Sequence, residues 1–145
     1  MENEKTPNQI TVEVTINAPV EKVWKVWSTA EDVSQWNAPS DDWFTSLVEI
    51  DFREQGRFLF RMEAKDKSTG FDHAGIYNEI VTHQLIKYTG HDDRKSTVEF
   101  VQDGTATHIT ETFDADPEIP IAIQEDFCKG VLNNFKKHTE SNSAQ

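Results

Sequence analysis

The chain has 145 residues and a formal net charge of −12, with 36% hydrophobic and 28% charged residues. This length predicts one domain, and the negative charge argues against anionic partners such as nucleic-acid phosphates or an acidic membrane surface. No apolar run is long enough for membrane insertion, no secretion signal opens the chain, and the single Cys128 excludes an internal disulfide. We therefore expect a single cytoplasmic domain over residues 1–145, with an ordered core of about 10–138 and polar tails at both ends.

A strand followed by an amphipathic helix is predicted at the start of the chain. Residues 10–16 alternate between apolar and polar side chains, which places the apolar ones on one face of a strand. Pro19 suits the first turn of a helix, because its φ is fixed and it has no N–H to leave unbonded. The residues that then recur at helical spacing are Val20, Val23, Trp24 and Trp27.

A second short helix and two strands come next. The helix covers about residues 31–35 and follows Thr29, a residue type typical of an N-cap. Residues 44–52 alternate, and the side chains sharing one face are Phe44, Val48, Ile50 and Phe52. After a tight turn at residues 54–56, residues 57–63 alternate again, with Phe58, Phe60 and Met62 on one face.

Four more strands and a long helix complete the chain. The strands are predicted at 71–81, 84–89, 96–101 and 107–113, with Asp103-Gly104 as a hairpin turn. A helix over 121–138 has an apolar face made by Ile123, Phe127, Val131 and Phe135. Gly130 lies inside this helix, where glycine costs about 1 kcal/mol relative to alanine. We expect either a close approach of the helix to the sheet at this point or space for a ligand.

The order of these elements predicts an α+β fold. It has a curved antiparallel sheet of about seven strands, two short N-terminal helices, and one long C-terminal helix over the concave face. A helix laid across a concave sheet leaves a gap between the two layers, and small-molecule sites commonly occupy such gaps.

Catalytic motifs are sparse. The chain has no Gly-rich phosphate loop, nucleophile elbow or His-Glu-x-x-His motif, so no catalytic residue, metal ligand or cofactor is assigned. Cys128 falls near the apolar face of the last helix and is interpreted as a buried structural thiol. Asp72-His73 and His91-Asp92-Asp93 are either weak sites for a divalent ion or, as we favour, ordinary solvated residues.

Three polar residues have neighbours that suggest a binding site. Glu111 shares a strand face with Ile109 and Phe113, so it is a candidate to point inward, where a carboxylate needs a partner or a raised pKa. His73 and Tyr77 share one face of the strand 71–81, and either this face lines the cavity or the face of Ala74, Ile76 and Ile80 does, because parity alone cannot choose between them. The candidate lining residues are Trp27, Trp36, Phe44, Phe58, Phe60, Met62, His73, Tyr77, Ile109, Glu111, Phe113, Phe127 and Val131.

The order of these segments resembles that of a known superfamily. The segments are Trp36-Asn37-Ala38-Pro39 after the first helices, Gly75–Ile80 leading through Thr82-His83-Gln84 to Leu85–Thr89, and the last helix with its Gly130. Together they are similar to the START-related (SRPBCC) superfamily with the helix-grip fold, also seen in birch-pollen-allergen-like proteins. The branch most resembled is that of the activator of the heat-shock protein 90 ATPase homologues, over residues 10–138.

This resemblance implies an internal hydrophobic pocket between the sheet and the last helix. The implied function is binding of a small hydrophobic or amphipathic molecule, such as a lipid, sterol, flavonoid or polyketide-like compound. One alternative is a chaperone co-factor or protein-interaction module, and another is a cyclase- or hydrolase-type enzyme. The partners expected are a small hydrophobic molecule and, under the first alternative, a chaperone protein, but no nucleic acid and no membrane insertion, in a monomer or homodimer.

Overall fold

The computed structural model describes residues 9–141, which form one seven-stranded antiparallel sheet and three helices. The strand order across the sheet is β1-β7-β6-β5-β4-β3-β2. The strands are β1 (Gln9–Ile16), β2 (Trp43–Ile50), β3 (Arg57–Ala64), β4 (Gly70–Val81), β5 (Leu85–Gly90), β6 (Lys95–Asp103) and β7 (Ala106–Asp114). The helices are α1 (Val20–Ser28), α2 (Ala30–Trp36) and α3 (Ile121–Ser141). Within residues 9–141, no helix is both long and apolar enough to cross a membrane.

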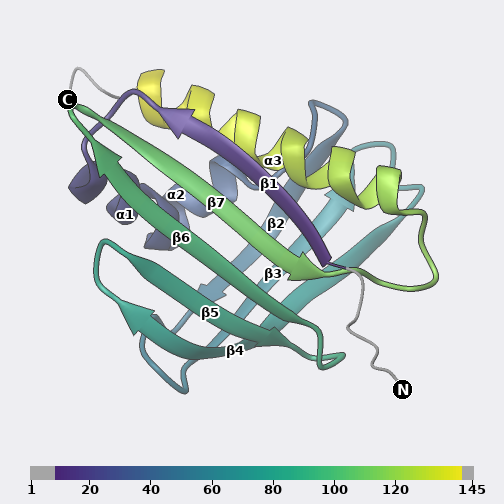
Figure 1. Cartoon of the computed structure of the whole chain (residues 1–145). Helices are drawn as coiled ribbons and strands as arrows, with labels where there is room; N and C mark the ends of the chain where they lie inside the picture. The colour runs from purple at the N-terminus through teal and green to yellow at the C-terminus, as the bar shows by residue number, and fades with distance from the viewer. Residues whose placement is uncertain (1–8, 142–145) are drawn as a thin grey trace.

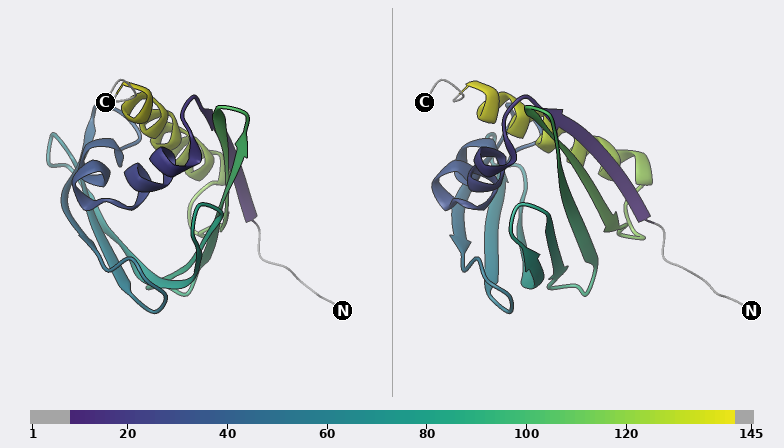
Figure 2. Two further views of the ribbon diagram at one scale, coloured as in Figure 1. Left: turned by 90° about the vertical axis from the view of Figure 1, so that its left-hand side faces the viewer. Right: turned by 60° about the vertical axis from the view of Figure 1, so that its left-hand side comes forward.

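The sheet curves into a trough that α3 crosses (Figure 1). Seen from its end, the trough runs from β2 on one side to β7 and β1 on the other, with α3 along its top (Figure 2, left). The two short helices α1 and α2 occupy one end of the trough (Figure 2, right). The predicted helix-grip fold is therefore confirmed, and the predicted elements differ from the observed ones by a few residues at their ends.

Helix α3 is fixed along the edge strand β1. The Lys136 Nζ atom donates hydrogen bonds to the Thr15 carbonyl oxygen (2.6 Å) and to the Glu140 carboxylate (2.7 Å). The backbone N–H of Asn17 donates to the same Glu140 oxygen at 2.8 Å. These bonds satisfy backbone groups that an edge strand otherwise presents to solvent.

The end of the trough that contains α1 and α2 is closed by aromatic packing. Trp36 lies 4.8 Å from Phe135 of α3 and Trp24 lies 5.0 Å from Phe100 of β6, both ring-centroid distances in edge-on geometry. The Trp36 indole N–H donates to the Val26 carbonyl oxygen at 3.1 Å, so its polar atom is satisfied inside the core. We call this end the sealed half of the concave face; its fully buried sheet residues include Ile86, Val98 and Ile109.

Two strand irregularities decide which side chains face the trough. In β2 the pairing with β3 shifts between Thr45 and Leu47, so Trp43 and Thr45 share the concave face with Val48. In β4 the pairing with β5 shifts between Tyr77 and Glu79, so Tyr77 and Ile80 both face inward although they are three residues apart. Each shift inserts one residue into the strand and reverses the alternation beyond it.

Gly130 marks a close approach, but to a loop and not to the sheet as expected. A Cβ atom added at Gly130 would lie 2.3 Å from the carbonyl oxygen of Pro39, in the loop that follows α2. In the same region, the Asn134 side chain of α3 donates to the Trp36 carbonyl oxygen at 2.9 Å. The glycine therefore allows α3 to pack directly on the backbone after α2.

Candidate ligand site

The concave face has a second half that is less completely covered. There, several side chains that face the trough by strand register are only half-buried, whereas Ile86, Val98 and Ile109 of the sealed half are buried. We call this region the open half. Its half-buried residues are Phe60, His73, Tyr88, Glu111 and Phe113 of the sheet and Phe127, Cys128 and Val131 of α3.

Glu111 is the carboxylate of the open half. Its cross-strand neighbours are Val98 of β6 and Val12 of β1, both buried, so the sheet positions directly beside it are apolar. The Cys128 thiol of α3 donates to Glu111 Oε1 at 3.5 Å. Burial raises the pKa of Glu111 to about 7, and hydrogen bonds with Cys128 and Tyr88 offset part of that rise. A carboxyl group with such a pKa can accept or donate a proton at neutral pH.

Tyr88, which interacts with Glu111, belongs to a cluster of aromatic rings. Tyr88 of β5 lies 5.0 Å from Phe58 and 5.7 Å from His73, measured between ring centroids. His73 in turn lies 5.7 Å from Phe60, and Phe58 lies 5.2 Å from Tyr77. Burial raises the pKa of both tyrosines, so each keeps its hydroxyl proton at neutral pH. The ring cluster therefore consists of uncharged aromatic groups with few polar atoms.

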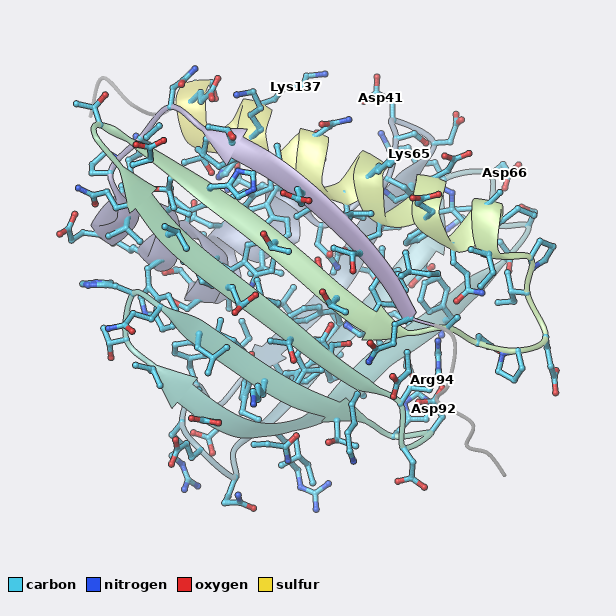
Figure 3. All side chains as sticks on the ribbon, viewed as in Figure 1. Asp41, Lys65, Asp66, Asp92, Arg94 and Lys137 are labelled. Atoms are coloured by element: carbon cyan, nitrogen blue, oxygen red, sulfur yellow. The ribbon has the colours of Figure 1, made fainter. Side chains whose placement is uncertain are left out.

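His73 is held in its neutral form. Burial lowers the pKa of His73 to about 4, with smaller contributions in the same direction from Arg94 and His91 and an opposing one from Asp92. Arg94 lies on the turn between β5 and β6 beside Asp92, and its Nε donates to that carboxylate at 2.6 Å (Figure 3). The cation at this edge of the site is thus already paired.

A group of aromatic residues lies where α3 begins. Trp43 of β2 contacts Phe127 of α3 at 5.7 Å and Phe71 of β4 at 5.9 Å between ring centroids. Phe71 is 40% exposed and Trp43 is half-buried, so this group borders solvent. The other three tryptophans belong to the core cluster at the sealed half.

The predicted lining residues divide among three locations. In the open half, the structure brings together Phe60, His73, Glu111, Phe113, Phe127 and Val131, and beside them on the concave face lie Phe58, Met62 and Tyr77, which are buried. Trp27, Trp36 and Ile109 instead pack in the sealed half. Phe44 was expected to face inward, but it is 36% exposed and pairs with Glu63 on the outer face, because the β2 irregularity reverses the alternation.

Three residues of this region were not among the predicted lining residues. Tyr88 is two residues from Ile86 in β5, so both side chains lie on the same face of the strand. This spacing is visible in the sequence. Trp43 faces inward only because of the irregularity in β2, which has no clear sequence signal. Cys128 was interpreted as a structural thiol; it is half-buried, and burial together with the Glu111 charge raises its pKa, which disfavours the nucleophilic thiolate.

Of the two candidate ion sites, Asp72-His73 is divided by strand alternation, and His91-Asp92-Asp93 lies on the turn between β5 and β6. Asp72 points to the outer face and pairs with Arg61 at 3.3 Å, whereas His73 faces the trough. Within residues 9–141, no group of three or more His, Cys, Asp or Glu side chains is arranged to hold a metal ion. A hollow of about 670 Å³ lies on the opposite, outer face of β3–β5, with charged residues such as Arg57 and Asp93 at its border.

Comparison with known proteins gives a family match over most of the chain. Residues 17–138 match the family described as "Activator of Hsp90 ATPase homolog 1-like protein". No curated protein matches the chain.

Solved structures resemble it over nearly their whole length. The solution structure of an AHSA1-like protein from Aeromonas hydrophila is 33% identical, with a TM-score of 0.87 over 95% of this chain and 96% of that one. The solution structure of a protein from Cytophaga hutchinsonii is 39% identical, with a TM-score of 0.79 over 92% and 93%. A crystal structure from Nitrosomonas europaea shares the fold at 14% identity, with a TM-score of 0.80 over 94% and 97%.

Proposed function

This chain belongs to the family of activator of Hsp90 ATPase homolog 1-like proteins, within the helix-grip superfamily, and from that premise we propose that its open half binds a small hydrophobic or amphipathic molecule. The observation that carries the proposal is the contrast between the two halves of one concave face. In the sealed half, Ile109 and Phe135 have no exposed surface, whereas Phe60 and Phe127 in the open half retain some.

The chemistry of the open half favours an apolar ligand with few polar atoms. Ligand sites are commonly concave and lined by apolar and aromatic side chains, with a few polar groups that fix orientation. Here the ring cluster supplies the apolar surface, and Glu111 and the Tyr88 hydroxyl are the polar groups. Lipids, sterols, flavonoids and polyketide-like compounds are the classes that we propose to test.

The test is a ligand panel read by two independent signals. A ligand that binds the folded state raises the melting temperature by mass action. The same ligand should shift backbone amide NMR signals of β4, β5, β7 and the first half of α3. A panel that changes neither signal would contradict the proposal.

A pair of variants locates the site. Phe60→Asp places a charge among the rings of the open half and should remove the thermal and NMR responses. Val101→Asp places the same charge on the outer face of β6, where Val101 is 59% exposed, and should leave both responses unchanged. Far-ultraviolet circular dichroism of both variants shows whether Phe60→Asp keeps its secondary structure. If that variant is unfolded, Phe60→Leu, which removes only the ring, replaces it and should weaken the response.

A second candidate function is a protein-interaction module that acts on a chaperone. It is favoured by the exposed isoleucines before and at the start of α3, namely Ile119, Ile121 and Ile123, which are 42%, 43% and 59% exposed. Adjacent exposed apolar side chains are typical of interaction surfaces. The test is the ATPase rate of a purified heat-shock protein 90 with this protein added. Ile121→Asp/Ile123→Asp should abolish any stimulation, while Val101→Asp should not.

A further inference from the structure

Glu111 has no cationic partner in the described part of the chain. Its hydrogen-bond partners are the Cys128 thiol at 3.5 Å and Tyr88, and neither carries a positive charge. A buried carboxylate normally pairs with a cation or stays protonated, because removing the charge from water is costly. The open half therefore contains one potential negative charge that the protein itself does not balance.

The rings beside Glu111 add a second preference for positive charge. Aromatic faces carry partial negative charge and attract cations that lie within about 6 Å of the ring. The three rings of Tyr88, Phe58 and His73 are mutual neighbours. The centroid distances are 5.0 Å for Phe58–Tyr88, 5.2 Å for Phe58–His73 and 5.7 Å for His73–Tyr88. A ligand group that contacts one ring is therefore close to the other two. His73 stays neutral because burial lowers its pKa to about 4, so it does not repel a cation at neutral pH.

The remaining charges near the site allow a cation to enter. Arg94, the positive residue near His73, is paired with Asp92 at 2.6 Å. The protein as a whole has a net charge of −12, which favours the approach of cations over anions. These conditions disfavour a fatty acid or another carboxylate as the ligand.

Resting on the proposed function, we propose that the open half selects molecules with an ammonium group on an apolar or aromatic body, the ammonium lying between Glu111 and the ring cluster. A hydroxyl group is the main competitor for this position. With ionised Glu111 a hydroxyl forms a hydrogen bond in which only the acceptor is charged, whereas in the bond from an ammonium both the donor and the acceptor are charged. An ammonium also supplies the missing opposite charge, which a hydroxyl cannot.

The test uses three probes with one body and different end groups, namely 4-phenylbutylamine, 4-phenylbutanol and 4-phenylbutyrate. Isothermal titration calorimetry at pH 8 should give an affinity for the amine at least about tenfold higher than for the alcohol, with the carboxylate weakest. Amide NMR shifts on β4, β5, β7 and α3 should locate the amine in the open half. An alcohol or carboxylate that binds as tightly as the amine would overturn the inference.

Two variants with the same change in net charge separate the site from the acidic surface. Glu111→Gln should reduce the preference for the amine over the alcohol to less than about threefold, mainly through a lower affinity for the amine. Glu99→Gln removes an exposed carboxylate on the outer face of β6 and should keep the full preference. A preference retained in Glu111→Gln, or lost equally in both variants, means that the amine binds elsewhere. Glu111→Met, of similar length and uncharged, gives a second check on the loss.

The affinity for the amine should also depend on pH. Binding an ammonium requires an ionised Glu111, so below its pKa of about 7 the affinity should fall, by about tenfold between pH 8 and pH 6. The titratable groups that face Glu111 stay fixed over this range: burial raises the pKa of Tyr88 and of Cys128, and His73 is neutral. The affinity for the alcohol should change much less, because its hydroxyl carries no charge. An amine affinity that is independent of pH would contradict the ion pair.

The outcomes also separate this inference from the proposed function. If 4-phenylbutanol or members of the lipid and flavonoid panel bind in the open half but the amine has no advantage, the ammonium preference is wrong and ligand binding stands. If no probe and no panel member binds there, both are wrong.

Discussion

Glu111 and His73 face the same trough, and burial favours the neutral form of each. For Glu111 the neutral form is protonated, so its folded-state pKa of about 7 lies above the usual 4.5. For His73 the neutral form is deprotonated, so its folded-state pKa of about 4 lies below the usual 6.5. Glu111 therefore lowers stability as the pH rises from about 4.5 to 7, whereas His73 lowers stability as the pH falls from about 6.5 to 4.

We predict that single substitutions reveal these two opposite dependences of stability on pH. In Glu111→Gln the cost of ionising Glu111 is absent, so the variant should gain stability relative to the parent as the pH rises from 4.5 to 7. The gain should reach about 2 kcal/mol, reduced from the full shift because the side chain is partly accessible. In His73→Gln the gain relative to the parent should appear instead as the pH falls from 6.5 to 4.

The measurement is urea denaturation of the three proteins from pH 4 to pH 8. Differences between variant and parent remove the contribution of surface carboxylates that all three share. Differences that do not vary with pH would show that neither group is desolvated in the folded protein.

Thr139 offers a second test at the scale of one residue. Its side chain has no exposed surface, and within residues 9–141 its Oγ1 is the buried side-chain polar atom without a hydrogen-bond partner. Thr139→Val keeps the shape and removes the unsatisfied hydroxyl, so it should stabilise the protein by about 1 kcal/mol. Thr139→Ser keeps the hydroxyl and loses a methyl group, and should destabilise it by a similar amount. Thermal denaturation of both variants checks the opposite signs; a destabilised Thr139→Val would mean that the hydroxyl is satisfied.

At the scale of elements, the sequence predicts strands well where the alternation is unbroken. Glu111 could be named as a candidate for the concave face because it shares strand parity with Ile109 and Phe113 in a regular strand. The outer face of Phe44 could not be predicted, because the extra residue in β2 is defined by the pairing with β3. The pattern of apolar and polar residues in the sequence does not reveal it. The face of His73 and Tyr77 stayed open for a related reason: β4 is apolar on both sides, and its irregularity lies at Asn78.

The contact of α3 with the loop after α2 predicts the effect of adding one methyl group. Gly130→Ala gains about 1 kcal/mol of helix propensity, but its Cβ would lie 2.3 Å from the Pro39 carbonyl oxygen. Because backbone must move to relieve this overlap, we expect a net loss of about 1–3 kcal/mol in the free energy of unfolding. Asn133→Ala, at the exposed position three residues further along α3, should be neutral or slightly stabilising. A Gly130→Ala protein as stable as the parent would contradict the tight contact.

Helix α3 should be indispensable for folding. It buries Leu132 and Phe135 completely and adds Phe127 and Val131 to the concave face. Each such side chain contributes roughly 1.5–3 kcal/mol on burial, and the sum approaches the total stability of a typical domain. A chain that ends at Asp116 should therefore show no cooperative thermal transition by circular dichroism. A transition near that of the full chain would mean that the sheet and the two short helices form a core of their own.

At the scale of the whole molecule, the two halves of the trough have different tryptophans. Trp24, Trp27 and Trp36 belong to the sealed half, whereas Trp43 lies beside Phe71 and Phe127 at the border of the open half. We predict that a bound ligand changes tryptophan emission mainly through Trp43. Trp43→Phe should lose most of the emission change while the rise in melting temperature persists, and Trp36→Phe should keep the emission change. An emission change that persists in Trp43→Phe would place the ligand nearer the sealed half.

The position of β1 has a consequence for how the protein is made. This strand is synthesised before the other six, yet it pairs with β7, whose residues are made about a hundred positions later, as in Gln9 with Asp114. The helix that holds its outer edge, through Lys136 and Glu140, is made later still. During translation β1 at first has neither neighbour, so the sheet can be completed only after β7 and α3 have been synthesised and have left the ribosome. Pairing over such a long separation is slow, and an unpaired apolar strand in that interval is a site for aggregation or for a chaperone.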